Sequence, residues 1–195
     1  MDATYDEETD TFSNYQYMKY NYFGVFSNVE PVMNDGYIIG LKTTFSTNSP
    51  FAWTDEITHN FECIPGEDPT IISFDVNHAE RNREIYPVII LNARKEDDLL
   101  GEVEVGIKNL VDGTIMKLII RKEDAITIDS RYSRISDISG VLKFDDLGIK
   151  DVDYIYWPKV YNGNNQFEIT VSDEHTTSPV DMTIKYREAR KVGAY

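Results

Sequence analysis

Apolar and polar residues alternate along most of the chain in short runs, and turn-forming residues separate one run from the next. This alternation is typical of strands that bury one face and expose the other. The stretch closest to a helical period, Asn77–Tyr86, has room for only one or two turns. The sequence therefore predicts an all-β fold. Its predicted strands are Thr70–Val76, Tyr86–Ala93, Leu99–Ile107, Thr114–Lys122, Ala125–Asp129, Val141–Asp145, Tyr154–Tyr161, Gln166–Ser172 and Asp181–Glu188.

Tight turns join several of these runs. Asp-Gly and Asn-Gly pairs favour the positive φ values of a two-residue hairpin turn, and they occur at Asp35-Gly36, Asp112-Gly113 and Asn162-Gly163. Pro87 and Pro158 lie inside strand-like runs, so we expect those runs to begin at the proline or to lie at a sheet edge. Many short strands at this spacing predict an antiparallel β-sandwich or a barrel.

The pattern divides the chain into three parts. Residues 1–14 are polar, acidic and aperiodic, which predicts a loosely held arm. Residues 15–48 are rich in aromatic and β-branched residues around an Asp-Gly turn, which predicts a β-hairpin outside the main core. Ser49-Pro50 breaks the second hairpin strand, so we place a domain junction there and assign residues 49–195 to the sandwich.

The inward faces of the strands predict the core of the sandwich. Because the side chains of a strand alternate between its two faces, the apolar members of each run should pack together. The aromatic load of the hairpin is too large to leave wet, so we expect it to cover the sandwich, pair with another copy or present an apolar patch. The expected core residues are Ile71, Phe74, Ile89, Leu91, Leu118, Ile120, Ile126, Ile128, Trp157, Phe167, Ile169, Ile184 and Tyr186.

Charge and composition exclude several classes of function. The formal net charge of −15 argues against unaided nucleic-acid binding, which needs Lys and Arg to displace counterions, and against an anionic membrane surface. The first ten residues hold five acids and no base, unlike a signal peptide, and the apolar runs are too short to span a bilayer. A single cysteine cannot form an intrachain disulfide.

The search for catalytic and metal-binding patterns finds little. A Cys–His nucleophile could in principle form from Cys63 and one of three scattered histidines, His59, His78 and His175. A buried structural thiol explains Cys63 better. The histidines lack the spacing of metal ligands. Asp151 lies in "DVDYIY", which lacks the glycine and distal glutamate of a calcium loop and is interpreted as a solvated loop.

Carbohydrate chemistry leaves a few further candidates. Glu102 and Glu104 alternate to one face of a strand, as the paired carboxylates of a glycosidase would, but acids in this position usually form the wet side of a sheet. Trp53 and Trp157 offer rings that could stack on a sugar, although both are better explained by packing. "LVDGT", with Leu110 where a phosphatase needs aspartate, is interpreted as a hairpin turn. No catalytic, cofactor-binding or metal-binding residue is predicted.

Several stretches, in order along the chain, resemble the motifs of one protein family. Gly36–Trp53 resembles the strand and S-P-[YF]-A-W junction that end the first domain of that family, and Ile85–Leu91 resembles its I-Y-P strand. Glu123–Ile135 resembles its I-T-I-D segment, although Ser130 stands where a glycine often follows. Tyr156–Val171 is similar to the W-P-R-L-V-N-G-x-N-x-I-x-V strand. Thr183–Tyr195 is similar to the Y-R-x-x-R-K-V-G end. The family that these stretches resemble is the distal tail proteins of long-tailed phages.

This resemblance implies a structural role and no enzymatic activity. Members of the family form a ring, usually a hexamer, at the lower end of the tail tube of the virion, after assembly in the cytoplasm of the bacterial host. The first domain builds the ring, and the second, a galectin-like β-sandwich of the jelly-roll type, holds receptor-binding protein or other baseplate components. The implied partners are the tail tube protein above and the tail-associated lysin or hub below.

One departure from the family concerns the first domain. A sizeable domain precedes the S-P-x-A-W junction in the family, whereas 48 residues precede it here. The chain is then a fragment, a shortened member or the product of a late start codon. The hairpin of residues 15–48 is expected to be a remnant of the ring-forming domain, and a ring built by this chain alone is not expected. The alternative function is a carbohydrate-binding β-sandwich module, since galectin-like sandwiches can bind sugars.

The basic C-terminal tail gives a final expectation. Met182, Ile184 and Tyr186 alternate inward as a last strand would, which predicts pairing up to about Arg187. The following "EARKVGAY" is expected to run over the surface. Deleting Ala189–Tyr195 should then barely change the melting temperature, because exposed ion pairs contribute well under about 1 kcal/mol each.

Overall fold

The computed structural model describes residues 4–6, 11–13, 20–66, 68–79, 83–94, 102–121, 125–137, 139–141, 156–172 and 179–191. The regular secondary structure within these residues consists of β-strands, and the strands pair antiparallel. The chain divides into two compact units, Met1–Asp55 and Glu56–Tyr195. The predicted all-β, antiparallel fold is confirmed.

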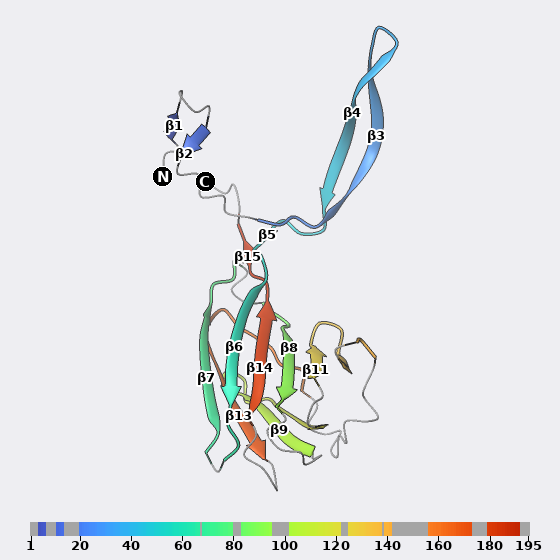
Figure 1. Ribbon diagram of the computed structural model, residues 1–195. Helices are drawn as coiled ribbons and strands as arrows, with labels where there is room; N and C mark the ends of the chain where they lie inside the picture. The colour runs from blue at the N-terminus through green and yellow to red at the C-terminus, as the bar shows by residue number, and fades with distance from the viewer. Residues whose placement is uncertain are drawn as a thin grey trace. The chain divides into compact units, whose positions relative to one another are not determined.

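The first unit is dominated by a long two-stranded hairpin (Figure 1). Strand β3 (Gly24–Asn34) pairs with strand β4 (Tyr37–Thr47), and the turn between them is the predicted Asp35-Gly36 pair. Both turn residues have positive φ, 48° and 83°, as a two-residue turn between twisted strands requires. Two register irregularities interrupt the ladder, which is typical of β-bulges.

Three shorter strands complete this unit. Strand β1 (Thr4–Asp6) pairs with strand β2 (Thr11–Ser13), within the residues predicted to be a loose arm. Strand β5 (Ala52–Trp53) follows the Ser49-Pro50 break, and an isolated bridge joins Trp53 to Asn21. Strand β4 therefore ends before the proline, while the boundary between the two compact units lies between Asp55 and Glu56.

The second unit is a sandwich of two antiparallel sheets (Figure 1). One sheet has four strands in the order β10-β9-β13-β7, and the other has five in the order β12-β11-β8-β14-β6. The strands are β6 (Ile57–Cys63), β7 (Thr70–Val76), β8 (Val88–Ala93), β9 (Glu102–Asn109), β10 (Ile115–Arg121), β11 (Ala125–Asp129), β12 (Arg134–Asp137), β13 (Gly163–Ser172) and β14 (Val180–Tyr186). A short strand, β15 (Ala189–Arg190), follows β14.

A single hydrophobic cluster fills the space between the two sheets. Of the thirteen expected core residues, eleven are buried and Trp157 packs partly buried against the cluster, so the alternation identified the core faces. The prediction that Ile71 belongs to the core is wrong, because Ile71 is 53% exposed while Ile72 is 3% exposed. Two adjacent isoleucines cannot both point inward from a strand, and Phe74 shares the face of Ile72, not that of Ile71.

The strand boundaries agree with the sequence in most places. Thr70–Val76 and Ala125–Asp129 are confirmed as predicted, and the run containing Pro87 begins just after the proline. The strand predicted at Tyr154–Tyr161 is wrong for the part that the structure describes, where Val160 forms only an isolated bridge with Ile85. The sequence also missed β6 and β12. The predicted strand at Val141–Asp145 falls outside the described residues except for Val141.

The expectation that the chain leaves the fold after Arg187 is also wrong. Glu188 is 4% exposed and Ala189 is fully buried. The backbone of Ala189 makes two hydrogen bonds to the segment after β7, one through its N–H and one through its C=O. Residues 188–190 are therefore built into the sandwich unit, and a deletion that starts at Ala189 removes part of the fold.

Gly106 gives a test of the four-stranded sheet. This residue is buried in the middle of β9, opposite Thr170 of β13, and a Cβ atom added to it would lie 2.3 Å from the Thr170 hydroxyl oxygen. We expect Gly106→Ala to lower the free energy of unfolding by about 1–3 kcal/mol through overpacking. In a Thr170→Ala background the same change should cost much less, and equal costs in urea unfolding would contradict the steric explanation.

Candidate functional site

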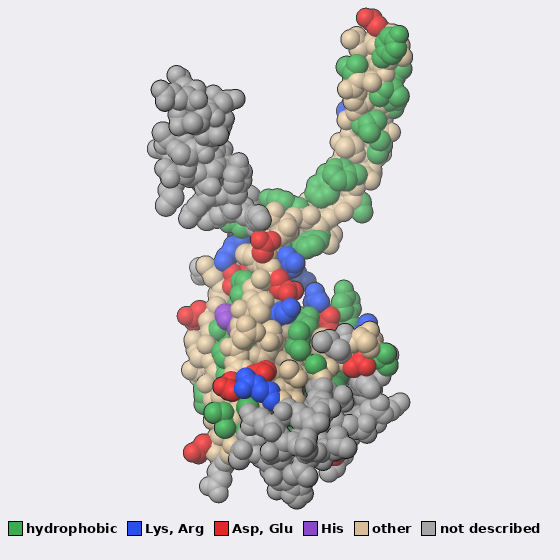
Figure 2. Space-filling view, viewed as in Figure 1, with side chains coloured by type: hydrophobic (Ala, Val, Ile, Leu, Met, Phe, Trp, Pro, Cys, Tyr) green, Lys and Arg blue, Asp and Glu red, His purple; other side chains and the backbone are tan. Residues whose placement is uncertain are grey.

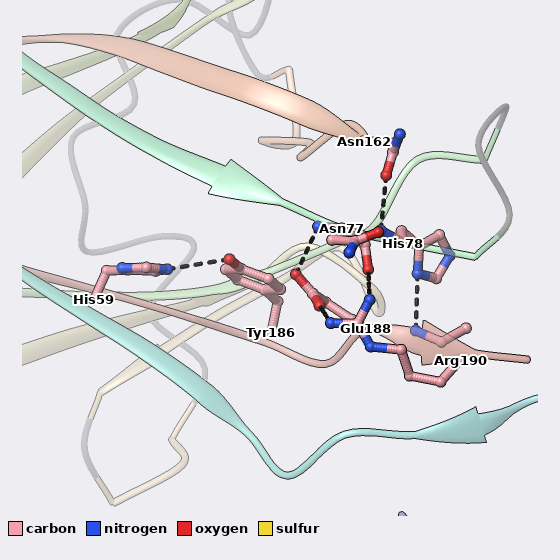
Figure 3. Close-up of polar contacts among 8 residues, drawn as sticks. His59, Asn77, His78, Asn162, Tyr186, Glu188 and Arg190 are labelled. Atoms are coloured by element: carbon pink, nitrogen blue, oxygen red, sulfur yellow. Dashed lines mark hydrogen bonds and ion pairs between the residues drawn. The ribbon is translucent and has the colours of Figure 1, made fainter. Parts of the chain in front are cut away.

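A polar network lies at one end of the sandwich, where the C-terminal segment meets the end of β7 (Figure 3). His78 is 3% exposed, and its backbone N–H donates to Oδ1 of Asn162 at 2.7 Å. Its ring Nδ1 accepts from the backbone N–H of Ala189 at 2.9 Å, which requires that nitrogen to carry no proton. The N–H of Ala79 donates in turn to the carbonyl of Ala189 at 2.9 Å. The histidine therefore ties three chain segments together.

Glu188 is the buried charge of this network (Figure 3). Its Oε1 accepts from the backbone N–H of Asn77 at 2.9 Å, and its Oε2 pairs with the guanidinium of Arg190. The same guanidinium donates to the carbonyl of Asn77. A buried carboxylate is tolerated only when it is paired and hydrogen-bonded, and both conditions hold here.

His59 joins the network from β6 and lies in an aromatic cluster between the two sheets. Its ring stacks on Phe74 of β7 at 4.7 Å, and its Nε2 lies 3.1 Å from the hydroxyl of Tyr186. Burial lowers the pKa of His59, while the negative charge of Glu188 opposes that change. Burial also raises the pKa of Tyr186 to about 12, with Glu188 and Asp75 adding to the effect. The phenol therefore stays protonated near neutral pH.

The arrangement is suited to holding the chain together and not to catalysis. A nucleophilic site needs an activated nucleophile, a base within hydrogen-bond reach and room for a substrate. Here the Tyr186 phenol is neutral, the Glu188 carboxylate is held in an ion pair, and the acceptor nitrogen of His78 binds a backbone amide. We therefore interpret the network as a tether for the C-terminal segment.

The lowered pKa of His59 predicts a pH dependence of stability. A histidine whose pKa is lower in the folded state binds fewer protons there, so its contribution is complete above the unfolded pKa of about 6.5 and is lost as pH falls through the folded value. We expect the melting temperature to fall between about pH 7.5 and pH 5.5. The fall should be smaller in His59→Gln, and an equal fall in both proteins would contradict the assignment.

The structure places Cys63 in the core, as the interpretation of a structural thiol predicts. Cys63 is free and fully buried, and burial raises the pKa of its thiol to about 11, with Asp181 and Glu62 contributing. A protonated buried thiol is a poor nucleophile. His175 and the two aspartates of "DVDYIY", Asp151 and Asp153, lie outside the described residues.

The candidates for carbohydrate chemistry lie on separate elements. Glu102 and Glu104 are both exposed on the outer face of β9, and Glu104 pairs with Lys117 at 3.7 Å. Trp157 packs against the core cluster of the sandwich. Trp53 belongs to β5 of the first unit and is partly buried there. The loop containing Leu110 is the predicted hairpin turn between β9 and β10.

A surface hollow of about 440 Å³ lies over the β6–β14 strand pair. Its polar groups are already bonded to one another: Arg94 donates to Asp181 at 2.6 Å and to Glu62 at 2.7 Å, and Thr183 donates to Asn60 at 2.9 Å. Neighbouring Asp181 and Glu62 raise the pKa of the Arg94 guanidinium. The hollow is lined by Asn60, Phe61, Glu62, Asp181, Met182 and Thr183.

The sequence analysis did not identify two buried asparagines that hold the loop before β13. Asn165 is fully buried, accepts from the N–H of Tyr161 at 2.8 Å and donates to the carbonyls of Tyr161 and Gly163. Asn109 is 2% exposed and donates to the carbonyl of Lys159 at 2.9 Å. Asparagine at strand ends often closes turns in this way, and the "NGNN" sequence was the available signal.

The hairpin offers a different kind of candidate, an interaction surface. Hydrophobic side chains follow its whole length in the space-filling view (Figure 2). Within Gly24–Thr47 only Glu30, Asp35 and Lys42 carry charge. We call the exposed apolar side chains of this range the hairpin surface; they are Val25, Phe26, Val29, Val32, Met33, Tyr37, Ile38, Ile39, Leu41 and Phe45.

The hairpin surface is unusual for a soluble protein. Several of its side chains are more than 60% exposed, including Phe26 at 70% and Leu41 at 67%. Phe26 and Phe45 contact each other across the strands, with ring centroids 4.8 Å apart. A two-stranded ribbon without a second layer is at best marginally stable in water. A continuous exposed apolar surface of this kind marks an interaction site.

Comparison with known proteins does not assign the chain. No model of a known protein family and no curated protein matches it. The resemblance to distal tail proteins therefore depends on the short motifs alone.

Across the described ranges no group of three His, Cys, Asp or Glu side chains could hold a metal ion. The same residues include no helix with the length and apolar character needed to cross a membrane.

Proposed function

We propose that the chain is a structural adaptor of a phage tail tip or baseplate, similar to distal tail proteins, and that it is not an enzyme. In this role it links the tail tube to host-recognition or lysin components. The hairpin surface is the docking element of the first unit. The second unit is the galectin-like sandwich that holds a further baseplate component.

The observation that carries this proposal is the hairpin surface. Ten large apolar side chains are exposed on one two-stranded ribbon that carries three charges. Burying one such aliphatic or aromatic side chain contributes roughly 1.5–3 kcal/mol, so a partner that covers even part of the ribbon gains substantial free energy. A protein built for assembly has a use for such a surface, whereas a monomeric enzyme would risk aggregation.

The placement of the motif stretches agrees with this proposal. The junction motif ends at β5, the last strand of the first unit, and the I-T-I-D segment forms β11 of the five-stranded sheet. The I-Y-P and W-P segments meet each other through the bridge between Ile85 and Val160. The motifs therefore fall on elements that shape the fold, as expected for segments shared by a family of structural proteins.

Tail assembly in a bacterium that carries the gene tests the proposal. The gene would be replaced by a variant with two hairpin changes, Ile39→Thr and Leu41→Thr, which remove exposed aliphatic groups and place threonine, a β-branched residue suited to a strand, at both positions. We expect few or no complete tails in electron micrographs. The matched control changes two exposed aliphatics of the second unit, Ile71→Thr and Val141→Thr, and should assemble normally. Normal tails from the hairpin variant would overturn the proposal.

A glycan array separates the adaptor from the alternative, a carbohydrate-binding module. Sugar sites usually combine exposed stacking rings with polar groups, and the outer faces of β9 and β13 carry mainly Glu, Lys and small polar residues. We expect no selective, saturable binding. Selective binding that is lost in Trp157→Ala would favour the alternative.

A further inference from the structure

One end of the five-stranded sheet carries a row of charged side chains on its outer face. The strand registers place Lys185, Val88, Asp129 and Arg134 opposite one another on neighbouring strands. The adjacent positions on these strands are buried core residues, so the row points away from the core. In the space-filling view, Lys and Arg side chains lie among Asp and Glu side chains over this end of the sandwich (Figure 2).

The turn after β11 adds to this row. Arg131 donates to both carboxylate oxygens of Asp129, at 3.1 and 3.0 Å, and its guanidinium lies 5.5 Å from the ring centre of Tyr132. The Tyr132 ring is 75% exposed and Arg131 is 54% exposed. We call Arg131, Tyr132, Arg134 and Lys185 the basic end.

The charges of the basic end form one network. Lys185 pairs with Glu56 at 3.4 Å. The hydrogen bonds that Arg131 donates to Asp129 are the main reason why the pKa of its guanidinium is raised, and the charge of Glu56 adds to the effect. Arg134 lies opposite Asp129 on the neighbouring strand and donates to the carbonyl of Gly140 at 2.6 Å. The three cations Arg131, Arg134 and Lys185 therefore outnumber the two carboxylates Asp129 and Glu56, in a protein whose net charge is −15. On the opposite sheet Lys108 pairs with Glu168 and Lys117 pairs with Glu104, so each of these two cations has its own carboxylate.

The turn after β11 has two energetically unfavourable features. Ser133 has a φ of 50°, in the left-handed region that a residue with a Cβ atom adopts at a cost. The hydroxyl oxygen of Ser130 is buried and has no hydrogen-bond partner among the described residues. In this turn conformation the side chains of Arg131, Tyr132 and Arg134 lie close together at the surface. Exposed tyrosine and arginine side chains are enriched among residues that dominate binding energy in protein interfaces.

We propose that the basic end binds the acidic opening segment, Met1–Asp10, of a second copy of the chain. That segment carries Asp2, Asp6, Glu7, Glu8 and Asp10 and no basic residue, so its charge complements the excess on the basic end. A peptide carboxylate can share Arg131 and Arg134 with Asp129 without displacing it, and an aromatic ring of the peptide can pack on Tyr132. The contact is head-to-tail, because the two surfaces that meet are different.

A nucleic acid is a poorer match for the same surface. Phosphate backbones are recognised by rows of Lys and Arg that release many counterions on binding. Here two carboxylates, Asp129 and Glu56, stand within the row and would repel a continuous chain of phosphates. A short acidic peptide meets fewer of these groups at once, which is why we commit to the peptide.

Fluorescence anisotropy with a labelled synthetic peptide, MDATYDEETD, tests the proposal. The receptor is the full-length chain with Asp6→Asn, Glu7→Gln and Glu8→Gln, so that its own opening segment competes less. We expect saturable binding at about 50 mM salt that is largely lost at about 500 mM, since screening weakens exposed charge pairs. Arg131→Gln with Arg134→Gln, or Tyr132→Ala alone, should weaken binding at least about fivefold.

The matched control removes two other ion-paired cations, Lys108→Gln and Lys117→Gln, and should leave binding unchanged. A charge reversal adds a second measurement: Arg131→Glu with Arg134→Glu should prefer a peptide in which Glu7 and Glu8 are lysines. Absence of binding, equal loss in the control, failure of the reversed pair to bind, or tighter binding of an oligothymidylate of equal charge would each overturn the proposal. Because the hairpin is unchanged in these proteins, a failure here would leave the adaptor proposal standing.

Discussion

Removing two exposed aliphatic groups from the hairpin, with Ile39→Thr and Leu41→Thr, should weaken self-association of the purified chain at least about tenfold. The two side chains are 65% and 67% exposed, and covering each contributes roughly 1.5–3 kcal/mol to an interface that includes them. Threonine is β-branched and retains the strand preference of isoleucine, so the hairpin itself should persist. Sedimentation equilibrium across micromolar concentrations measures the change.

A matched pair of substitutions controls for a general loss of surface hydrophobicity. Ile71 and Val141 are 53% and 57% exposed and belong to the sandwich unit. The variant with Ile71→Thr and Val141→Thr should associate as the wild-type chain does. Equal weakening by the two pairs, or a wild-type chain that stays monomeric at about 100 µM, would show that the hairpin surface does not drive association.

Glu188→Ala should lower the free energy of unfolding by about 3 kcal/mol. The carboxylate is 4% exposed and holds the N–H of Asn77 and the guanidinium of Arg190, so its removal takes the acceptor from the Asn77 amide and the carboxylate partner from Arg190. Breaking a buried ion pair by removing one member typically costs about 3–5 kcal/mol. We take the low end because Arg190 is partly exposed and can turn toward water. Urea unfolding followed by tryptophan fluorescence measures it.

An exposed pair provides the comparison for Glu188. Glu104 pairs with Lys117 at 3.7 Å, and both side chains are about half exposed, so Glu104→Ala should cost under about 1 kcal/mol. Deleting Ala189–Tyr195 should act like Glu188→Ala, because it removes Arg190 and the amide that His78 binds. A deletion with no effect on stability would restore the simple view of a surface tail.

The sequence predicted the fold class because alternation with a period of two is a direct consequence of strand geometry. It also predicted the hairpin, since Asp35-Gly36 supplies the two positive φ values that the turn needs. It missed β6, whose inward positions include His59 and the partly exposed Ile57 and Phe61, and whose alternation is therefore weak. The expectation that Ile71 lies in the core went against the period of two, which groups Ile72 with Phe74 and Val76.

The candidate sites were harder to predict because they depend on contacts between distant segments. A charged residue such as Glu188 reads as exposed until Arg190 and the amide of Asn77 are placed around it. The exposure of the hairpin surface likewise depends on tertiary structure, since the same apolar residues would form a core if a second layer covered them. The sequence shows that the hairpin is rich in aromatic and aliphatic residues, and the structure shows that these side chains are exposed.

Gold-labelled antibodies against the chain, applied to tail particles released by a bacterium that carries its gene, provide the most direct test of the adaptor proposal. Electron micrographs should show label at the distal end of the tail, where a protein that links the tube to host-recognition components must lie. Intact tails that carry no label, while the chain remains free in the lysate, would contradict the proposal.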